Sequence, residues 1–310
     1  MSRIHEALKR AEQERAASQG GSSADPGRAV DTAAPDAAPL ATAVETAGSH
    51  AVAAAPAFSS PFTFDTLLAR CPQASWTPDS KTMLFFNAEE QGYGTEEFRT
   101  LRSRLYQIRE KRPLKKVLVT SSLPKEGKSF VAANLAQVLV RQQGRRALLI
   151  DADLRSPRLH INLGTNSEPG LSEYLMGEAD EFGVMQRGPM ENLFFVPAGR
   201  LVSSPAELVA NGRLKILLNR VEPLFDWIII DSPPAALVSD AGLLANQCDG
   251  VLMVVRSNAT PFDVAHKARQ EFRDKHLLGV VLNGVEVSSS NYSRYYYSTG
   301  YMNSKGKAQG

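Results

Sequence analysis

The chain has 310 residues, of which 43% are hydrophobic and 22% charged, and its formal net charge is +2. No apolar run reaches the roughly eighteen residues of a membrane-spanning helix, and so small a net charge gives no reason to expect nucleic acid as a partner. Its two cysteines are too few for a disulfide framework and fit no metal-ligand spacing. We therefore expect a soluble, cytoplasmic protein.

The first part of the chain predicts little folded structure. Residues 1–18 carry apolar side chains at helical spacing among charges, which predicts a short amphipathic helix that could dock onto a partner. These apolar residues are Ile4, Ala7, Leu8 and Ala11. Residues 19–87 are rich in Ala, Pro, Gly, Ser and Thr, above all before residue 61, and predict a mostly disordered linker.

Residues 88–287 predict one α/β domain, because helical and strand patterns alternate along them. The first pattern is a helix over residues 95–110. Apolar runs then predict strands near residues 116–120, 147–151, 192–196, 227–231, 250–255 and 278–283. Helical patterns between these runs would cover a largely parallel sheet.

The predicted helix over residues 95–110 carries Glu96, Arg99 and Arg102 at intervals of three. Steps of three residues keep side chains on one face of a helix. One interpretation is an ion pair within the helix. The other is a charged patch that contacts a complementary surface on a neighbouring subunit. The spacing by itself favours the ion pair.

The stretch from Lys116 to Ser129, KVLVTSSLPKEGKS, predicts a phosphate-binding loop. An apolar strand runs into a loop that ends in Gly127, Lys128 and Ser129, and the apolar spacing that follows indicates a helix. Backbone amides, a helix N-terminus and one lysine suit the charge of a triphosphate, and Ser129 suits Mg²⁺. A chance turn before a helix is the alternative, since Ser122 replaces the first glycine of the usual GxxxxGK[ST] pattern. The candidate nucleotide-binding residues are Ser122, Leu123, Pro124, Lys125, Glu126, Gly127, Lys128, Ser129 and Phe130.

Three aspartates follow two further apolar runs. RALLIDADLR, at 146–155, contains Asp151 and Asp153, and DWIIIDSPP, at 226–234, contains Asp231. Carboxylates at the carboxyl ends of parallel strands face the crevice where a doubly wound sheet binds its ligand. A lone aspartate after a strand is usually a cap. Three of them would repel one another unless Mg²⁺ and phosphate chemistry required them there, so they favour a magnesium-nucleotide site.

Residues 288–310 are rich in tyrosine. Five of the chain's eight tyrosines lie within ten residues, in a segment with too little apolar surface to fold alone. We therefore expect a flexible tail with accessible hydroxyls. The alternatives are an aggregation-prone edge, a membrane-interface anchor and a platform for single-stranded nucleic acid, the last weakened by the few cations nearby. The candidate phosphate acceptors are Tyr292, Tyr295, Tyr296, Tyr297 and Tyr301.

Together, GKS at 127–129, LLIDADLR at 148–155 and IIIDSPP at 228–234 resemble the Walker A, Walker A′ and Walker B motifs of the bacterial tyrosine kinases of capsule and exopolysaccharide loci. The resemblance extends from about Glu96 to the C-terminus. It implies an α/β P-loop NTPase fold, with a largely parallel, doubly wound sheet and flanking helices, unrelated to the fold of eukaryotic protein kinases. The chain departs from the family at Lys125, where glycine is usual.

The resemblance implies a non-specific protein-tyrosine kinase that transfers phosphate from ATP to its own tail, with Mg²⁺ as cofactor. Lys128 would neutralise charge on the β and γ phosphates. Ser129, Asp153 and Asp231 would hold Mg²⁺, directly or through water. Asp151 would orient the tyrosine hydroxyl and accept its proton. The candidate catalytic residues are thus Lys128, Asp151, Asp153 and Asp231.

The resemblance also implies partners. Glu96, Arg99 and Arg102 match a motif that links subunits of the family into a ring, in which each tail would reach a neighbouring subunit. A separate transmembrane chain-length regulator of polysaccharide export would act as activator and bring the kinase to the inner face of the cell membrane. A cognate tyrosine phosphatase would reverse the reaction. The expected role is control of exopolysaccharide or capsule polymerisation and export.

Two other functions remain open on the sequence. Positioning ATPases of the septum-site and plasmid-partition type resemble the chain in the same three segments, but they usually carry a lysine where Leu123 stands, and they lack a tyrosine tail. A nucleotide-gated regulator with negligible transfer activity is the third possibility.

Three further residues have alternative roles. Arg155 could offset charge at the site or form a structural ion pair. Asn283 could contact the adenine edge or belong to a turn, and a turn is favoured because Asn-Gly is common there. Asp240 is better explained as a helix cap than as a catalyst.

Overall fold

The computed structural model describes residues 62–86 and 94–286. The predicted N-terminal helix, the linker up to residue 61 and the tyrosine tail lie outside the described residues. The strands are β1 (Lys116–Ser121), β2 (Ala147–Asp151), β3 (Gln186–Arg187), β4 (Leu193–Val196), β5 (Trp227–Asp231), β6 (Gly250–Arg256) and β7 (Leu277–Asn283). The helices are α2 (Phe64–Arg70), α3 (Thr95–Lys111), α4 (Lys128–Val140), α5 (Leu159–Leu163), α6 (Leu171–Met176), α7 (Glu181–Val184), α8 (Pro205–Ala210), α9 (Arg213–Val221), α10 (Asp240–Ala245) and α11 (Phe262–Gln270).

The described strands form one sheet in the order β3-β4-β2-β5-β1-β6-β7. Every neighbouring pair is parallel except β3 with β4. The prediction of a largely parallel sheet is therefore confirmed, and all six predicted strands are present within two residues of their expected ends. The sequence did not predict β3, because two residues are too short to show a pattern.

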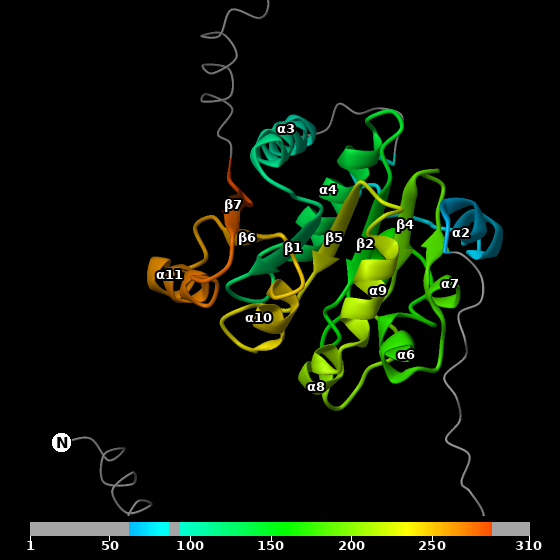
Figure 1. The fold of residues 1–310 in the computed structure, drawn as a ribbon. Helices are drawn as coiled ribbons and strands as arrows, with labels where there is room; N and C mark the ends of the chain where they lie inside the picture. The colour runs from blue at the N-terminus through cyan, green and yellow to red at the C-terminus, as the bar shows by residue number, and fades with distance from the viewer. Residues whose placement is uncertain (1–61, 87–93, 287–310) are drawn as a thin grey trace, which may run out of the picture. The chain divides into compact units, whose positions relative to one another are not determined.

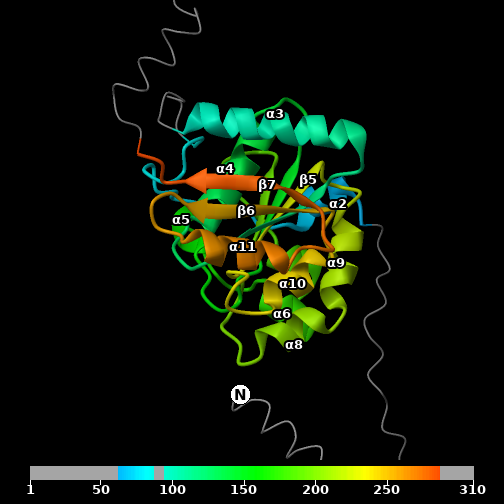
Figure 2. The same cartoon turned by 90° about the vertical axis from the view of Figure 1, so that its left-hand side faces the viewer.

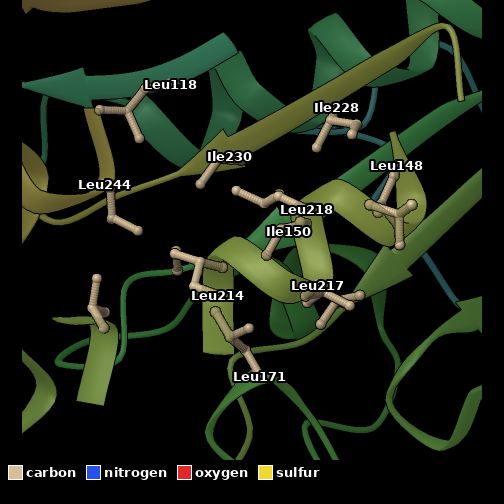
Figure 3. Packing of buried hydrophobic residues seen from close by; sticks show 14 of the residues in the cluster. Leu118, Leu148, Ile150, Leu171, Leu214, Leu217, Leu218, Ile228, Ile230 and Leu244 are labelled. Atoms are coloured by element: carbon tan, nitrogen blue, oxygen red, sulfur yellow. The ribbon is translucent and has the colours of Figure 1, made fainter. Parts of the chain in front are cut away.

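Helices cover both faces of the sheet, so its strands are apolar on both sides. Figure 1 shows α3 and α4 on one side and α6, α8 and α9 on the other. Alternate strand residues join different cores: Val117 and Val119 pack with α3, α4 and α5, whereas Leu118 packs with α6 to α10. Figure 3 shows part of the second core, in which leucines of α9 meet Ile150, Ile228 and Ile230 of the sheet. Such continuous burial explains the unbroken apolar runs in the sequence.

Helix α4 is the central helix of the first core. Ten of its thirteen residues are buried, because it lies between the sheet and α3. Arg102 of α3 contributes to this contact by donating to the Val138 carbonyl oxygen at 3.0 Å. A helix buried on all sides is apolar all round. No helix within residues 62–86 and 94–286 combines the length and the hydrophobicity that crossing a membrane requires.

The predicted linker over 19–87 is wrong for residues 62–86, which belong to the folded domain. Leu67 and Cys71 are buried in one core and Trp76, Met83 and Phe85 in the other. Two polar side chains of α4 fasten this segment. Asn134 accepts from the Leu84 amide and donates to the Thr82 carbonyl oxygen, each at 2.8 Å, and Gln137 accepts from the Phe85 amide at 3.3 Å. The segment was missed because it has little regular secondary structure, although it carries several aromatic residues.

Replacing Phe85 by alanine should lower the free energy of unfolding by about 3–5 kcal/mol, because a fully buried aromatic side chain leaves a cavity. Urea denaturation followed by circular dichroism measures this. Phe262→Ala is the matched control: Phe262 is 84% exposed, so its loss should cost about 0.5 kcal/mol or less. Equal stability of the two variants would show that residues 62–86 add nothing to the core.

Candidate active site

The fold brings the three predicted motifs to one edge of the sheet. Strand β1 lies at the point where the strand order reverses, with β5 and β2 on one side and β6 and β7 on the other. Asp231 of β5 pairs in register with Val119 of β1 and with Asp151 of β2. Because parallel strands end at the same edge, the loop after β1 meets the aspartates of β2 and β5.

The phosphate loop, residues 122–129, joins β1 to α4 through a left-handed turn. Gly127 has φ 97°, and a Cβ atom there would lie 2.0 Å from Nδ2 of Asn283, so no other residue fits without a shift. Helix α4 begins at Lys128, and the first-turn amides of a helix have no intrahelical partner. They carry the positive end of the helix dipole, which suits an anion.

The two departures from the usual loop pattern have structural explanations. Ser122 is fully buried and is not among the described residues with positive φ, so a side chain is tolerated where the pattern has glycine. Lys125 does adopt a left-handed backbone, with φ 65°. Glycine adopts this conformation more readily than lysine does.

Lys128 lies among carboxylates from two strands. Its Nζ atom is 2.7 Å from Oδ2 of Asp153 and 3.9 Å from Oδ2 of Asp231. Burial lowers the pKa of Lys128, but the Asp231 and Asp153 carboxylates outweigh burial and raise it above its usual value. The lysine is therefore charged, and its ammonium group stands at the end of the phosphate loop.

Ser129 and Asp231 form the second contact of the site. The Ser129 hydroxyl donates to Oδ2 of Asp231 at 2.5 Å. The other carboxylate oxygen, Oδ1, is buried and has no hydrogen-bond partner among the described residues. Burial raises the pKa of Asp231 to about 6, against the opposing effects of Lys128 and Ser129.

This pair fits a magnesium ion. A hydroxyl and a carboxylate with a spare oxygen are hard ligands, and Mg²⁺ typically takes one or two carboxylates and completes its shell with phosphate and water. Within the described ranges, no group of three or more His, Cys, Asp or Glu side chains is placed to hold a metal ion by itself. Ser129 and Asp231, with Asp153 nearby, are the residues that would hold Mg²⁺.

Asp151 is fully buried, and both of its carboxylate oxygens accept backbone amides. Oδ1 accepts from Asp153 at 3.2 Å and Oδ2 from Leu159, the first residue of α5, at 3.1 Å. Burial raises the pKa of Asp151 to about 8, and the neighbouring Asp231 and Asp153 carboxylates add to the effect. The side chain thus shapes the turn after β2 as well as contributing to the charge of the site.

The structure shows what Arg155, Asp240 and Asn283, whose roles the sequence left open, contact within the chain. Arg155 forms a two-pronged ion pair with Asp240, with Nε and Nη2 at 2.8 and 2.9 Å from the carboxylate. Asp240 is the first residue of α10. Asn283 ends β7 and donates from Nδ2 to the Glu126 carbonyl oxygen at 2.9 Å, so its amide group contacts the phosphate loop itself.

The three charged residues of α3 that the sequence singled out also have partners within the chain. Glu96 forms an ion pair with Arg99, as the spacing favoured, and Arg102 bonds to α4. The Glu96 side chain remains 56% exposed. The five candidate acceptor tyrosines of the tail lie outside the described residues, so the structure brings none of them to the site.

The fold and the site define a P-loop NTPase: a phosphate loop with its lysine and serine, set beside the aspartates of two neighbouring parallel strands. A family model described as an AAA domain matches residues 125–263. The chain is 34% identical over 210 residues to tyrosine-protein kinase YwqD of Bacillus subtilis (strain 168), which covers 67% of this chain and 88% of that protein. The chain therefore belongs to the bacterial tyrosine-protein kinase family.

Two other relatives agree with this assignment. Putative tyrosine-protein kinase EpsB of Ralstonia nicotianae (strain ATCC BAA-1114 / GMI1000) is 33% identical over 210 residues, which cover 65% of this chain but only 28% of EpsB. The solved structure of the kinase domain of Escherichia coli tyrosine kinase ETK superposes with a TM-score of 0.60 at 26% identity, and the match covers 72% of this chain and 94% of that chain.

The stability of the nucleotide-free protein should depend on pH through Asp151. Its pKa is about 8 in the folded protein against an ordinary value of 3.8, so its stabilising effect is complete below pH 3.8 and is lost as the pH rises through about 8. Asp151→Asn should therefore gain stability relative to the wild type over this range, measured by urea denaturation at several pH values. The exposed Asp274→Asn control should follow the wild type. A constant difference between Asp151→Asn and wild type would contradict the raised pKa.

Proposed function

We propose that this chain is an ATP-dependent protein-tyrosine autokinase that phosphorylates tail tyrosines of neighbouring subunits. The proposal rests on one observation: Lys128 and Ser129, at the end of the phosphate loop, both lie close to the carboxylate of Asp231. These groups supply what phosphoryl transfer needs most, which is positioning and charge stabilisation of the nucleotide.

The residues divide the work as follows. The Lys128 ammonium stabilises charge that develops on the β and γ phosphates. Ser129, Asp153 and Asp231 hold Mg²⁺, which when bound neutralises phosphate charge and orients the nucleotide. Asp151, which ends β2 beside Asp153, is proposed to orient the tyrosine hydroxyl and accept its proton.

The tail is the proposed acceptor because the two tyrosines among the described residues are committed to packing; Tyr93 lies outside the described residues. Tyr174 is buried in the core, and the Tyr106 hydroxyl accepts from Nε1 of Trp227 at 3.2 Å.

Transfer between subunits is proposed through a ring built on Glu96, Arg99 and Arg102, with the exposed Glu96 carboxylate available to a neighbour. A transmembrane chain-length regulator would activate the kinase at the membrane, a phosphatase would reset it, and polysaccharide polymerisation and export would respond.

Lys128→Met should lower tyrosine phosphorylation about 100-fold or more, because it removes a charge aimed at the transferred phosphate. Purified protein is incubated with Mg-ATP, and phosphorylated residues are mapped by mass spectrometry. Lys267→Met, on the exposed face of α11, is the control and should behave as wild type. ATP hydrolysis with an unmodified tail in the wild type would favour a positioning ATPase instead.

Transfer between subunits should be visible in a mixture. A Lys128→Met chain with its tail is combined with an active chain that lacks residues 291–310, and only the inactive chain should gain phosphotyrosine. Phosphates on a crowded tail carry about −1.5 to −2 charge each, so their repulsion should also reduce the oligomer mass after ATP is added. Light scattering measures that mass. An unmodified tail in the mixture would exclude transfer in trans, and an unchanged mass after heavy phosphorylation would exclude the repulsion.

A further inference from the structure

Glu126 lies within the phosphate loop, yet both of its carboxylate oxygens face protein groups. Oε2 accepts from the backbone amide of Leu123 at 2.7 Å, across the turn of the loop. Oε1 is in a short hydrogen bond with the hydroxyl of Thr260, which lies between β6 and α11. The residue is 3% exposed. Its carboxylate therefore connects two parts of the fold that are 134 positions apart.

Further bonds fasten the same part of the loop to the ends of β6 and β7. Nη1 of Arg256 donates to the Lys125 carbonyl oxygen at 3.1 Å, and Nδ2 of Asn283 donates to the Glu126 carbonyl oxygen at 2.9 Å. The Arg256 amide also donates to the Thr260 hydroxyl oxygen at 3.3 Å. Figure 2 shows β6 and β7 side by side, and both strands end at this edge. A pocket of about 400 Å³ is lined by Glu126, Arg256 and Thr260 among others.

A carboxylate at this position is unfavourable for an anionic ligand, because like charges repel. No ion pair compensates Glu126 within the described part of the chain, so its hydrogen bonds have to offset its burial. Hydrogen bonds to a charged acceptor are the strong ones, and they fix geometry as well as energy. Lys125, the residue before Glu126, has a left-handed backbone, which is unfavourable for a lysine. The loop therefore needs these hydrogen bonds to keep its shape.

We propose that Glu126 is a positioning residue that holds the phosphate loop in its nucleotide-binding shape by bridging the Leu123 amide and the Thr260 hydroxyl. The inference rests on the proposed function only in taking a nucleotide as the ligand. Glu126 itself contacts no phosphate, and its hydrogen bonds matter more than its charge. Glutamine, which accepts through Oε1 and donates through Nε2, can make both bonds and should replace it.

The test is the affinity of the full chain for a fluorescent ADP analogue in the presence of Mg²⁺, which needs no kinase activity. Glu126→Ala should weaken binding about tenfold or more, and Thr260→Val should weaken it in the same direction. The double variant should lose less affinity than the sum of the two single losses, because both changes remove the same bond between Glu126 and Thr260. Glu126→Gln and Thr260→Ser should bind as wild type. Glu271→Ala, at the exposed end of α11, is the control for loss of a carboxylate, and thermal denaturation checks that each variant is folded.

Three results would overturn the inference: wild-type affinity in Glu126→Ala, wild-type affinity in Thr260→Val, or equal losses in Glu126→Gln and Glu126→Ala. If Glu126→Ala fails to fold, the Thr260 pair alone decides, since Val and Thr have nearly the same shape. A wild-type chain that binds the analogue but transfers no phosphate would contradict the kinase function and leave the role of Glu126 standing.

Discussion

The site depends on the ion pair between Lys128 and Asp153, which stands beside two further buried carboxylates, Asp151 and Asp231. Removing a carboxylate from water costs several kcal/mol unless a partner compensates it. One lysine cannot balance three carboxylates. Burial raises the pKa values of Asp151 and Asp231, and the neighbouring carboxylates add to the effect. The described site therefore carries fewer positive than negative groups. A divalent cation bound there would offset the difference. The rest of the fold holds these groups together: β1, β5 and β2 are neighbours, and α4 starts where the lysine is needed.

The sequence predicted well the features that depend on residues close together in the chain. Strands buried on both faces read as unbroken apolar runs, so six of them could be located within two residues. The phosphate loop could be recognised because its residues act through the local backbone, and the aspartates of β2 and β5 because each ends its own apolar run. The pair of Glu96 with Arg99 on α3 was likewise favoured by spacing alone.

What could not be predicted depends on contacts between distant positions. The Arg155–Asp240 pair spans 85 positions, and the bridge from Glu126 to Thr260 spans 134. The segment over 62–86 is fixed by Asn134 of α4, about fifty positions later, rather than by a pattern of its own. Two polar residues within the buried helix α4, Asn134 and Gln137, were a local signal for that contact, because a buried amide group needs partners.

The hydrogen bond from Asn283 to the Glu126 carbonyl oxygen has a mechanical consequence. Asn283 is the last residue of β7, the edge strand of the sheet, and the chain continues from it toward the tyrosines. The loop proposed to bind the phosphate donor and the strand that leads to the proposed acceptor tyrosines are thus joined by a single amide group. A displacement of the chain at the end of β7 would therefore shift the Glu126 carbonyl group, within the phosphate loop itself.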